Sequence, residues 1–242
     1  MAKEEIAKLI KLSEVKPLSF VTSGVKEIDD MTGGFPKGRM TEIYGMQGVG
    51  KTEVVLHCLS AISNEAKVLY IDAENALNPE RLVRKGAKAS NVTVVADSVL
   101  EEVANLVNAN VTKYDVIVVD SVATLVPNAE AQGQTGDQFV GLKPRLMGQW
   151  LRKLTPLLGK SDCALVFINQ LRESMVLYGD PLFTPGGKAL PFSASLRLKL
   201  STTKADRIKG SDGSWKGHKV TVEVIKSKVS APHRTTTFKL EY

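Results

Sequence analysis

The stretch Gly45-Met-Gln-Gly-Val-Gly-Lys51-Thr52 decides the fold. It matches the pattern of a glycine, four residues and then Gly-Lys-Ser/Thr, in which successive backbone N–H groups turn inward around nucleotide phosphates. Such a loop needs a strand before it and a helix after it. The strand expected at residues 40–44 and the helix with an apolar stripe expected at residues 51–64 supply both. The sequence therefore predicts a phosphate-binding loop, with ATP as its ligand.

The ligand contacts of this loop follow from its chemistry. Lys51 is expected to reach the β and γ phosphates, and the hydroxyl of Thr52 is expected to hold Mg²⁺. Asp120 ends the apolar stretch 116–119, where phosphate-loop proteins carry a second metal contact. We therefore expect ATP and Mg²⁺ as cofactors. The residues expected around the nucleotide are Gly45, Met46, Gln47, Gly48, Val49, Gly50, Lys51, Thr52 and Glu53.

Two further carboxylates close the apolar stretch 67–72, in the run Asp72-Ala-Glu74. A carboxylate at this place could orient a water molecule for in-line attack on the γ-phosphate. Either Asp72 or Glu74 could do so, and both could instead cap the loop before Pro79. Spacing alone leaves these readings open.

Composition bounds the class of protein. The chain has 242 residues, of which 43% are hydrophobic and 24% charged, so it is long enough for one sizeable globular domain. A net charge of +6 permits an anionic partner without requiring one. Cys58 and Cys163 lie in apolar runs and are expected to fill the core. No stretch resembles a signal peptide or a membrane span, so we expect a soluble, cytoplasmic protein with no membrane contact.

The pattern along the chain alternates between strands and helices, which predicts an α/β fold with helices on both faces of a mostly parallel sheet. Strands are expected at 40–44, 67–72, 91–95, 115–120 and 164–169. Helices are expected at 51–64, 79–85, 98–111 and 142–158, the third starting with a capping box at Ser98 and Glu101. The final third alternates between apolar and polar residues at 193–200 and 219–226 and ends in a strand at 235–240. We expect these three segments to be antiparallel additions to the sheet.

Several longer motifs accompany the loop. They are Tyr70-Ile-Asp-Ala-Glu-Asn-Ala-Leu77, Asp115-Val-Ile-Val-Val-Asp-Ser-Val-Ala123, Phe167-Ile-Asn-Gln-Leu-Arg172, Gly186-Gly-Lys-Ala-Leu190 and Lys226-Ser-Lys-Val-Ser-Ala-Pro232. In their order and spacing they resemble the bacterial RecA recombinase family over residues 20–242. The resemblance implies a RecA-like phosphate-loop NTPase core over 18–242, a short N-terminal polymerisation helix and linker in 1–17, and no C-terminal domain.

The resemblance also assigns catalytic roles. Besides Lys51, it makes Glu74, rather than Asp72, the residue that activates water. It makes Gln170 the residue that senses the γ-phosphate. Lys226 and Lys228 match lysines that reach the γ-phosphate of the adjacent subunit. Phe192 matches a residue of the subunit interface.

On the base side, the resemblance points to Asn78, Arg81 and Tyr242. Asn78 stands where the family has an acidic residue near the adenine, and Arg81 stands where it has a stacking aromatic. An arginine plane can also stack on a base.

Two segments, 130–141 and 171–184, match the DNA-binding loops of the family. The implied partners are single-stranded DNA, homologous duplex DNA, and further copies of the chain in a helical filament. The residues expected to contact DNA are Val140, Arg145, Arg152, Arg172, Met175, Val176, Tyr178, Gly186 and Gly187.

The sequence thus favours an ATP-dependent recombinase that pairs and exchanges DNA strands. One alternative is an ATP-binding paralogue or mediator that exchanges no strands itself. Another is a ring-forming helicase or circadian-type ATPase of the same fold, although such rings lack the segment from Lys226 to Pro232.

Overall fold

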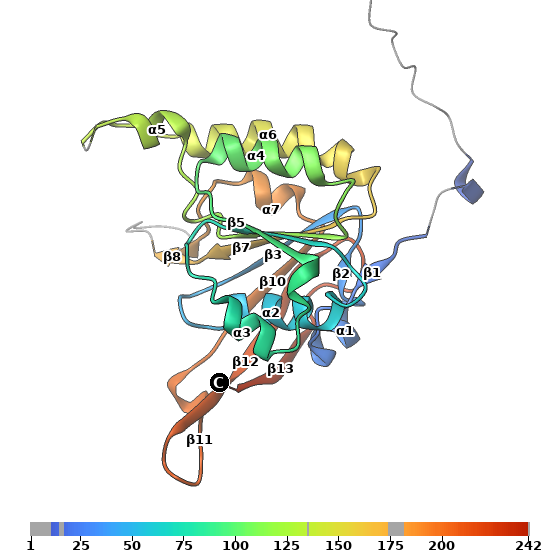
Figure 1. Cartoon of the computed structure of the whole chain (residues 1–242), viewed down its shortest axis with the longest axis vertical. Coiled ribbons are helices and arrows are strands. Elements are labelled where there is room, and N and C mark those ends of the chain that lie inside the picture. The colour runs from blue at the N-terminus through green and yellow to red at the C-terminus, as the bar shows by residue number, and fades with distance from the viewer. Residues whose placement is uncertain (1–10, 15–16, 135, 174–181, 242) are drawn as a thin grey trace, which may run out of the picture.

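The computed structural model describes residues 11–14, 17–134, 136–173 and 182–241. Its centre is one twisted sheet with the strand order β11-β12-β10-β3-β7-β6-β4-β5, and β13 pairs with β12 (Figure 1). Helices cover both faces of this sheet. The predicted α/β class is therefore confirmed.

Five strands form the parallel centre of the sheet. They are β3 (Arg39–Gly45), β7 (Ala164–Gln170), β6 (Val116–Asp120), β4 (Val68–Asp72) and β5 (Val92–Val95), each parallel to its neighbour. Every residue of β4 and β6 is buried, as expected for strands covered on both faces. Because parallel strands end at the same edge, Gly45, Gln170, Asp120 and Asp72 all lie at one edge of the sheet.

Two apolar layers flank the strands. On one face pack α2 (Lys51–Ile62), α1 (Lys26–Thr32) and α3 (Pro79–Arg84). On the other face lie α4 (Leu100–Asn110), α6 (Leu142–Gly159) and α7 (Ala189–Ser193). Cys58 and Cys163 are buried in these two layers, which confirms their predicted place in the core.

The C-terminal strands depart from the prediction in one respect. β12 (Trp215–Ser227) and β13 (Thr235–Glu241) are antiparallel, as expected. β10 (Leu196–Ser201), however, pairs with β3 in parallel and with β12 antiparallel. The reason is that the chain crosses one face of the sheet through α7 before it enters β10, and such a crossover returns the chain in the same direction. The expectation that 193–200 is antiparallel to the core was therefore wrong, and residues 193–195 are not in the strand.

The predicted capping box at Ser98 is also wrong. α4 begins at Leu100 after Val99, with no side-chain cap. The carbonyl of Ser98 accepts a hydrogen bond from Val126 N–H instead, and Glu101 accepts one from Asn128 N–H at 2.9 Å. Both residues are used to join the helix to the segment after β6.

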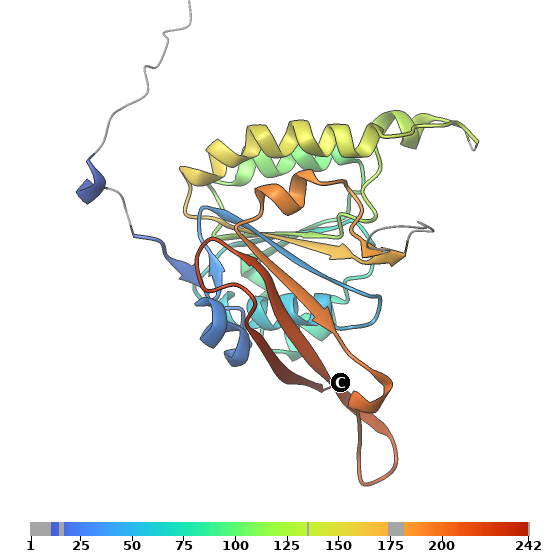
Figure 2. The ribbon, with the colours of Figure 1, turned by 180° about the vertical axis from the view of Figure 1, so that it is seen from behind.

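Smaller elements complete the chain. They are η1 (Leu12–Glu14), β1 (Phe20–Val21), β2 (Phe35–Pro36), η2 (Ala89–Asn91), α5 (Asn128–Gln132), β8 (Arg172–Glu173), β9 (Leu182–Phe183), η3 (Lys204–Asp206) and β11 (Arg207–Lys209). Figure 2 shows the hairpin of β11 and β12 extending away from the helical layers. The N-terminal polymerisation helix expected within residues 1–17 lies largely outside the described residues. Within the described part of the chain, no helix is long and apolar enough to cross a membrane.

Candidate active site

The phosphate-binding loop joins β3 to α2, as predicted. Gly50 precedes the helix with φ 98°, and a Cβ at this position would collide with the side chain of Leu240. Lys51 is 8% exposed, and its ammonium donates to the carbonyls of Gly45 at 3.1 Å and Met46 at 2.8 Å. Burial lowers the pKa of Lys51, against the opposing pull of Asp120. The ammonium is thus held over the loop by carbonyls that a phosphate oxygen can replace.

The residues expected to hold Mg²⁺ are in contact. Oδ2 of Asp120 accepts hydrogen bonds from the hydroxyl of Thr52 at 2.9 Å and from the hydroxyl of Tyr70 at 2.6 Å. Oδ1 of Asp120 is buried and has no hydrogen-bond partner among the residues that the structure describes. Burial raises the pKa of Asp120 to about 6. A buried carboxylate oxygen without a partner is costly, and a hard divalent cation is a ligand that satisfies it. The site therefore fits Mg²⁺.

Glu74 and Gln170 meet at the same edge although 96 positions separate them in the chain. Oε1 of Glu74 accepts a hydrogen bond from Nε2 of Gln170 at 2.8 Å and another from the hydroxyl of Ser121 at 2.5 Å. Ser121 directly follows Asp120, the residue expected to hold Mg²⁺, so the Glu74 carboxylate lies beside the candidate metal site.

Asp72, the rival carboxylate, has a different environment. Its Oδ1 accepts a hydrogen bond from Ala76 N–H at 3.1 Å, and its Oδ2 accepts one from Leu77 N–H at 2.9 Å. Asp72 thus caps the loop that carries Glu74, which is the structural alternative that the sequence left open.

A cavity of about 270 Å³ lies over the loop. It brings together side chains that lie far apart in the sequence: Gln47, Lys51, Thr52, Glu74, Asp120 and Gln170 all line it. Of the other loop residues, Val49 is buried and Met46 is 48% exposed.

A cluster of charged side chains, which includes two residues of the cavity lining, lies at one side of this cavity. Glu53 is buried, with Arg81 at 2.6 Å and Lys85 at 3.0 Å from its carboxylate oxygens. These contacts lack hydrogen-bond geometry, because neither oxygen of Glu53 has a hydrogen-bond partner in the described chain. Arg81 lines the cavity. Asn78 caps α3 by accepting a hydrogen bond from Arg81 N–H at 3.1 Å, and Tyr242 lies outside the described residues.

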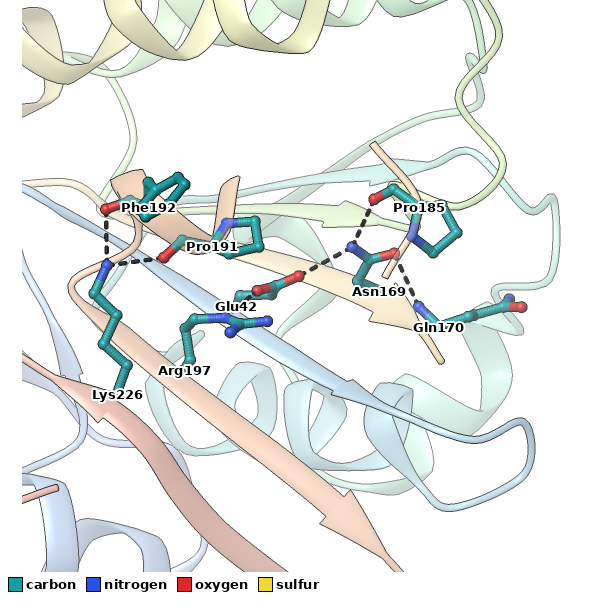
Figure 3. A network of polar contacts seen from close by, with 8 residues as sticks. All are labelled: Glu42, Asn169, Gln170, Pro185, Pro191, Phe192, Arg197 and Lys226. Carbon is teal, nitrogen blue, oxygen red and sulfur yellow. Dashed lines mark hydrogen bonds and ion pairs between the residues drawn. The ribbon is translucent and has the colours of Figure 1, made fainter. Parts of the chain in front are cut away.

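The two lysines expected to act on a neighbouring subunit lie apart from the loop. The ammonium of Lys226 donates to the carbonyls of Pro191 at 2.8 Å and Phe192 at 2.7 Å, at the end of α7 (Figure 3). Lys228 N–H donates to the carbonyl of Ser195 at 2.8 Å. Phe192 itself is 72% exposed. Among the described residues that line the cavity over the loop, neither lysine appears.

Comparison with known proteins decides the family. A family model described as the RecA N-terminal domain matches residues 1–242. The chain belongs to the RecA family. It is 41% identical to Protein RecA of Clostridium perfringens strain 13, over 97% of this chain and 68% of the relative. It is 44% identical to Protein RecA of Clostridium tetani over 87% of this chain and 60% of the relative. It is 43% identical to Protein RecA of Nostoc punctiforme over 90% of this chain and 61% of the relative.

In this RecA-family chain the expected DNA contacts are distributed over three elements. Val140 is 92% exposed just before α6, and Arg145 and Arg152 lie on that helix, both exposed. Arg172 is exposed on β8. Met175, Val176 and Tyr178 lie outside the described residues.

The two glycines of this set have a packing role in the RecA-family chain. Gly186 is buried with φ +92°, and a Cβ there would lie 3.1 Å from Val122. Gly187 has φ +77°, and a Cβ there would lie 2.8 Å from Pro144. The segment after β9 therefore approaches the start of α6 more closely than side chains would permit.

Sequence reasoning missed some site residues of this RecA-family chain. Tyr70 and Ser121 contact the carboxylates, and Lys85 joins the cluster of charged side chains. His218 lines the cavity, with Nε2 3.4 Å from the carbonyl of Val49. Both Tyr70 and Ser121 lie within the quoted motifs. Ser121 directly follows the strand-ending Asp120, which was a signal for it, whereas Tyr70 reads as an ordinary residue of a buried strand. Lys85 and His218 had no local signal.

Proposed function

We propose that this chain is a DNA-dependent ATPase that forms filaments on single-stranded DNA and exchanges strands with homologous duplex DNA. The observation that carries this proposal is the 2.8 Å contact between Gln170 and Glu74. Gln170 ends β7, and β8 begins two residues later, where the segment that resembles a DNA-binding loop starts. One amide thus lies between a candidate hydrolytic carboxylate and a candidate DNA-binding segment.

Nucleotide binding is assigned to the loop and its lysine. The backbone N–H groups of the loop and the start of α2 surround the phosphates, and Lys51 contacts the β and γ phosphates. Thr52 and Asp120 would hold Mg²⁺, which when bound would neutralise charge on the phosphate oxygens.

Glu74 orients the attacking water and accepts its proton in this proposal. Oε1 of Glu74 accepts hydrogen bonds from Gln170 and Ser121 in the structure. A γ-phosphate oxygen offers the Gln170 amide a charged acceptor, and such charge-assisted hydrogen bonds are the stronger kind. Gln170 would then leave Glu74 for the phosphate, which frees the carboxylate for water and moves the end of β7.

Completion of the site is assigned to a neighbouring copy. Lys226 contacts the carbonyl of the exposed Phe192, and Lys228 contacts that of Ser195. Neither lysine is among the described residues that line the cavity over the loop. A cation supplied in trans raises the rate of phosphoryl transfer about 10³- to 10⁵-fold where it has been measured. This arrangement makes hydrolysis depend on filament assembly.

Strand exchange by the purified chain is the experiment that tests this function. A labelled single strand should replace its homologue in a duplex when ATP and Mg²⁺ are present. Electron microscopy of the same mixture should show helical filaments. ATP binding without strand exchange would support the mediator function instead, and closed rings would support the ring-forming ATPase.

A further inference from the structure

Glu42 is a fully buried carboxylate in β3, three residues before the phosphate loop. Its Oε2 lies 2.6 Å from Nε of Arg197 on β10, and its Oε1 accepts a hydrogen bond from Nδ2 of Asn169 on β7 at 3.0 Å (Figure 3). Arg197 is the register partner of Glu42, and Asn169 lies two residues beyond its other partner, Phe167. The alternation of strands therefore places these three polar side chains on one face of the sheet.

The Asn169 amide joins two further parts of the chain. Nδ2 of Asn169 also donates to the carbonyl of Pro185 at 3.1 Å, and Oδ1 of Asn169 accepts from Gln170 N–H at 2.9 Å. Pro185 follows β9, which pairs with β8. One side chain therefore connects the backbone of Gln170 to the segment that closes the β8–β9 pair.

The orientation of this amide is fixed from one side. The guanidinium of Arg197 can only donate hydrogen bonds, and the ionised carboxylate of Glu42 can only accept them. An asparagine amide fits either way round, so its partners decide its orientation. Only with Nδ2 toward Glu42 and Pro185 does Oδ1 face the N–H of Gln170.

We propose that Glu42 is a positioning residue that couples the nucleotide-sensing end of β7 to the base of the β8–β9 segment by holding the Asn169 amide in this orientation. When Gln170 moves toward a bound γ-phosphate, the hydrogen bond from its N–H displaces the Asn169 side chain. The hydrogen bond from Asn169 to the Pro185 carbonyl then displaces Pro185. DNA held by the β8–β9 segment acts back along the same contacts. The inference rests on the proposed function, since it assigns DNA to that segment.

Glu42→Gln is the near-isosteric test. Arg197 requires the oxygen of the substituted side chain, so the new NH₂ group faces the NH₂ of Asn169. Asn169 must then turn over, which places a donor against Gln170 N–H and an acceptor against the Pro185 carbonyl. The variant keeps the volume of the side chain and exchanges donor and acceptor at the Asn169 amide.

The quantity to measure is the coupling factor, the ratio of the Kd values of a slowly hydrolysed ATP analogue without and with a poly-dT oligonucleotide. For the wild type we expect a factor within the usual allosteric range of about 5- to 150-fold, and the same factor for DNA affinity. For Glu42→Gln we expect a factor near unity, with the analogue's Kd in the absence of DNA changed less than about threefold, since the loop itself is intact.

Asp29→Asn is the matched control. Asp29 accepts a hydrogen bond from Ser23 N–H at 2.8 Å, near the start of α1, and it should keep the wild-type factor. If Glu42→Gln does not fold, Asn169→Ala cuts the same link while leaving the ion pair of Glu42 and Arg197, and it must also lose coupling. A folded Glu42→Gln or Asn169→Ala variant with the wild-type factor would overturn the inference, because Glu42 would then serve stability alone. A wild-type factor of one would instead remove the proposed function, and this inference with it.

Discussion

Nε2 of Gln170 lies 2.8 Å from Oε1 of Glu74, so the amide at the end of β7 holds the carboxylate that follows β4. This contact joins two strand ends that have β6 between them in the sheet. It places a candidate water-activating group under the control of a residue that can also bond a phosphate. The first prediction concerns that carboxylate.

Replacing Glu74 by alanine should separate binding from hydrolysis. The phosphate loop and the metal-site pair remain, so the Kd for ATP should change little. Loss of a general base typically lowers the rate about 10²- to 10⁴-fold. Single-turnover hydrolysis and equilibrium binding measure the two quantities. Equal turnover by wild type and variant would remove Glu74 from this role. Asp72→Asn serves as the contrast, since Asp72 caps the loop and its loss should weaken folding as well.

Asp120→Asn should lower the affinity for MgATP without lowering the stability of the nucleotide-free chain. The wild-type carboxylate is 5% exposed, and its Oδ1 lacks a hydrogen-bond partner in the described residues. Removing such a charge relieves a desolvation cost that function requires. Thermal unfolding in EDTA should therefore give a Tm equal to or above that of the wild type. A clear fall in Tm would show that the carboxylate stabilises the fold.

Affinity for single-stranded DNA should fall between pH 7 and pH 9 because of Lys143. Its ammonium donates to the carbonyl of Ala123 at 2.9 Å, and burial, followed by the charge of Arg172, lowers its pKa to about 8. A lysine loses its positive charge above its pKa, so its attraction for phosphate disappears as the pH rises through 8.

Lys143→Arg should flatten this pH profile, since arginine stays charged. The salt dependence of binding at pH 9 should be steeper for Lys143→Arg than for wild type, by about 0.7 in slope for one phosphate contact. Lys113→Arg, an exposed exchange after the end of α4, should leave the wild-type profile unchanged. An identical pH profile for Lys143→Arg and wild type would contradict a contact between the Lys143 ammonium and a DNA phosphate.

Phe192→Ala should abolish self-association and leave the fold intact. The ring is 72% exposed on α7, so its removal opens no cavity in the core. Sedimentation with ATP and single-stranded DNA should show monomers in place of large assemblies. Leu157→Ala, at a residue 44% exposed on α6, is the matched control and should assemble normally. Filaments of normal length from Phe192→Ala would place the subunit interface elsewhere.

The parts of the site that the sequence could predict are those set by local pattern. The phosphate loop, the strand that ends in Asp120 and the carboxylate at Glu74 each belong to one contiguous motif. The direction of β10 could not be predicted, because it depends on the crossover through α7, a five-residue helix whose proline and serine give a weak helical pattern.

Side-chain contacts between neighbouring strands could not be predicted from local sequence pattern either. Tyr70 reads as an ordinary core residue until β4 and β6 are paired, when its hydroxyl meets Asp120. In the sequence, Glu42 is only a charged residue within a buried strand. Its role becomes clear when the neighbouring strands place Arg197 and Asn169 on its two sides. Polar partners that lie far apart in the chain become visible only when the strand order is known.

If the Glu74–Gln170 site responds to DNA, the steady-state rate of ATP hydrolysis should depend on the DNA concentration. The wild-type chain should be assayed at low salt with increasing single-stranded DNA, with Glu74→Ala as the inactive control. We expect a wild-type hydrolysis rate that rises with DNA concentration and saturates, and a Glu74→Ala variant that stays inactive throughout. A wild-type rate that is the same with and without DNA would contradict a response of this site to DNA.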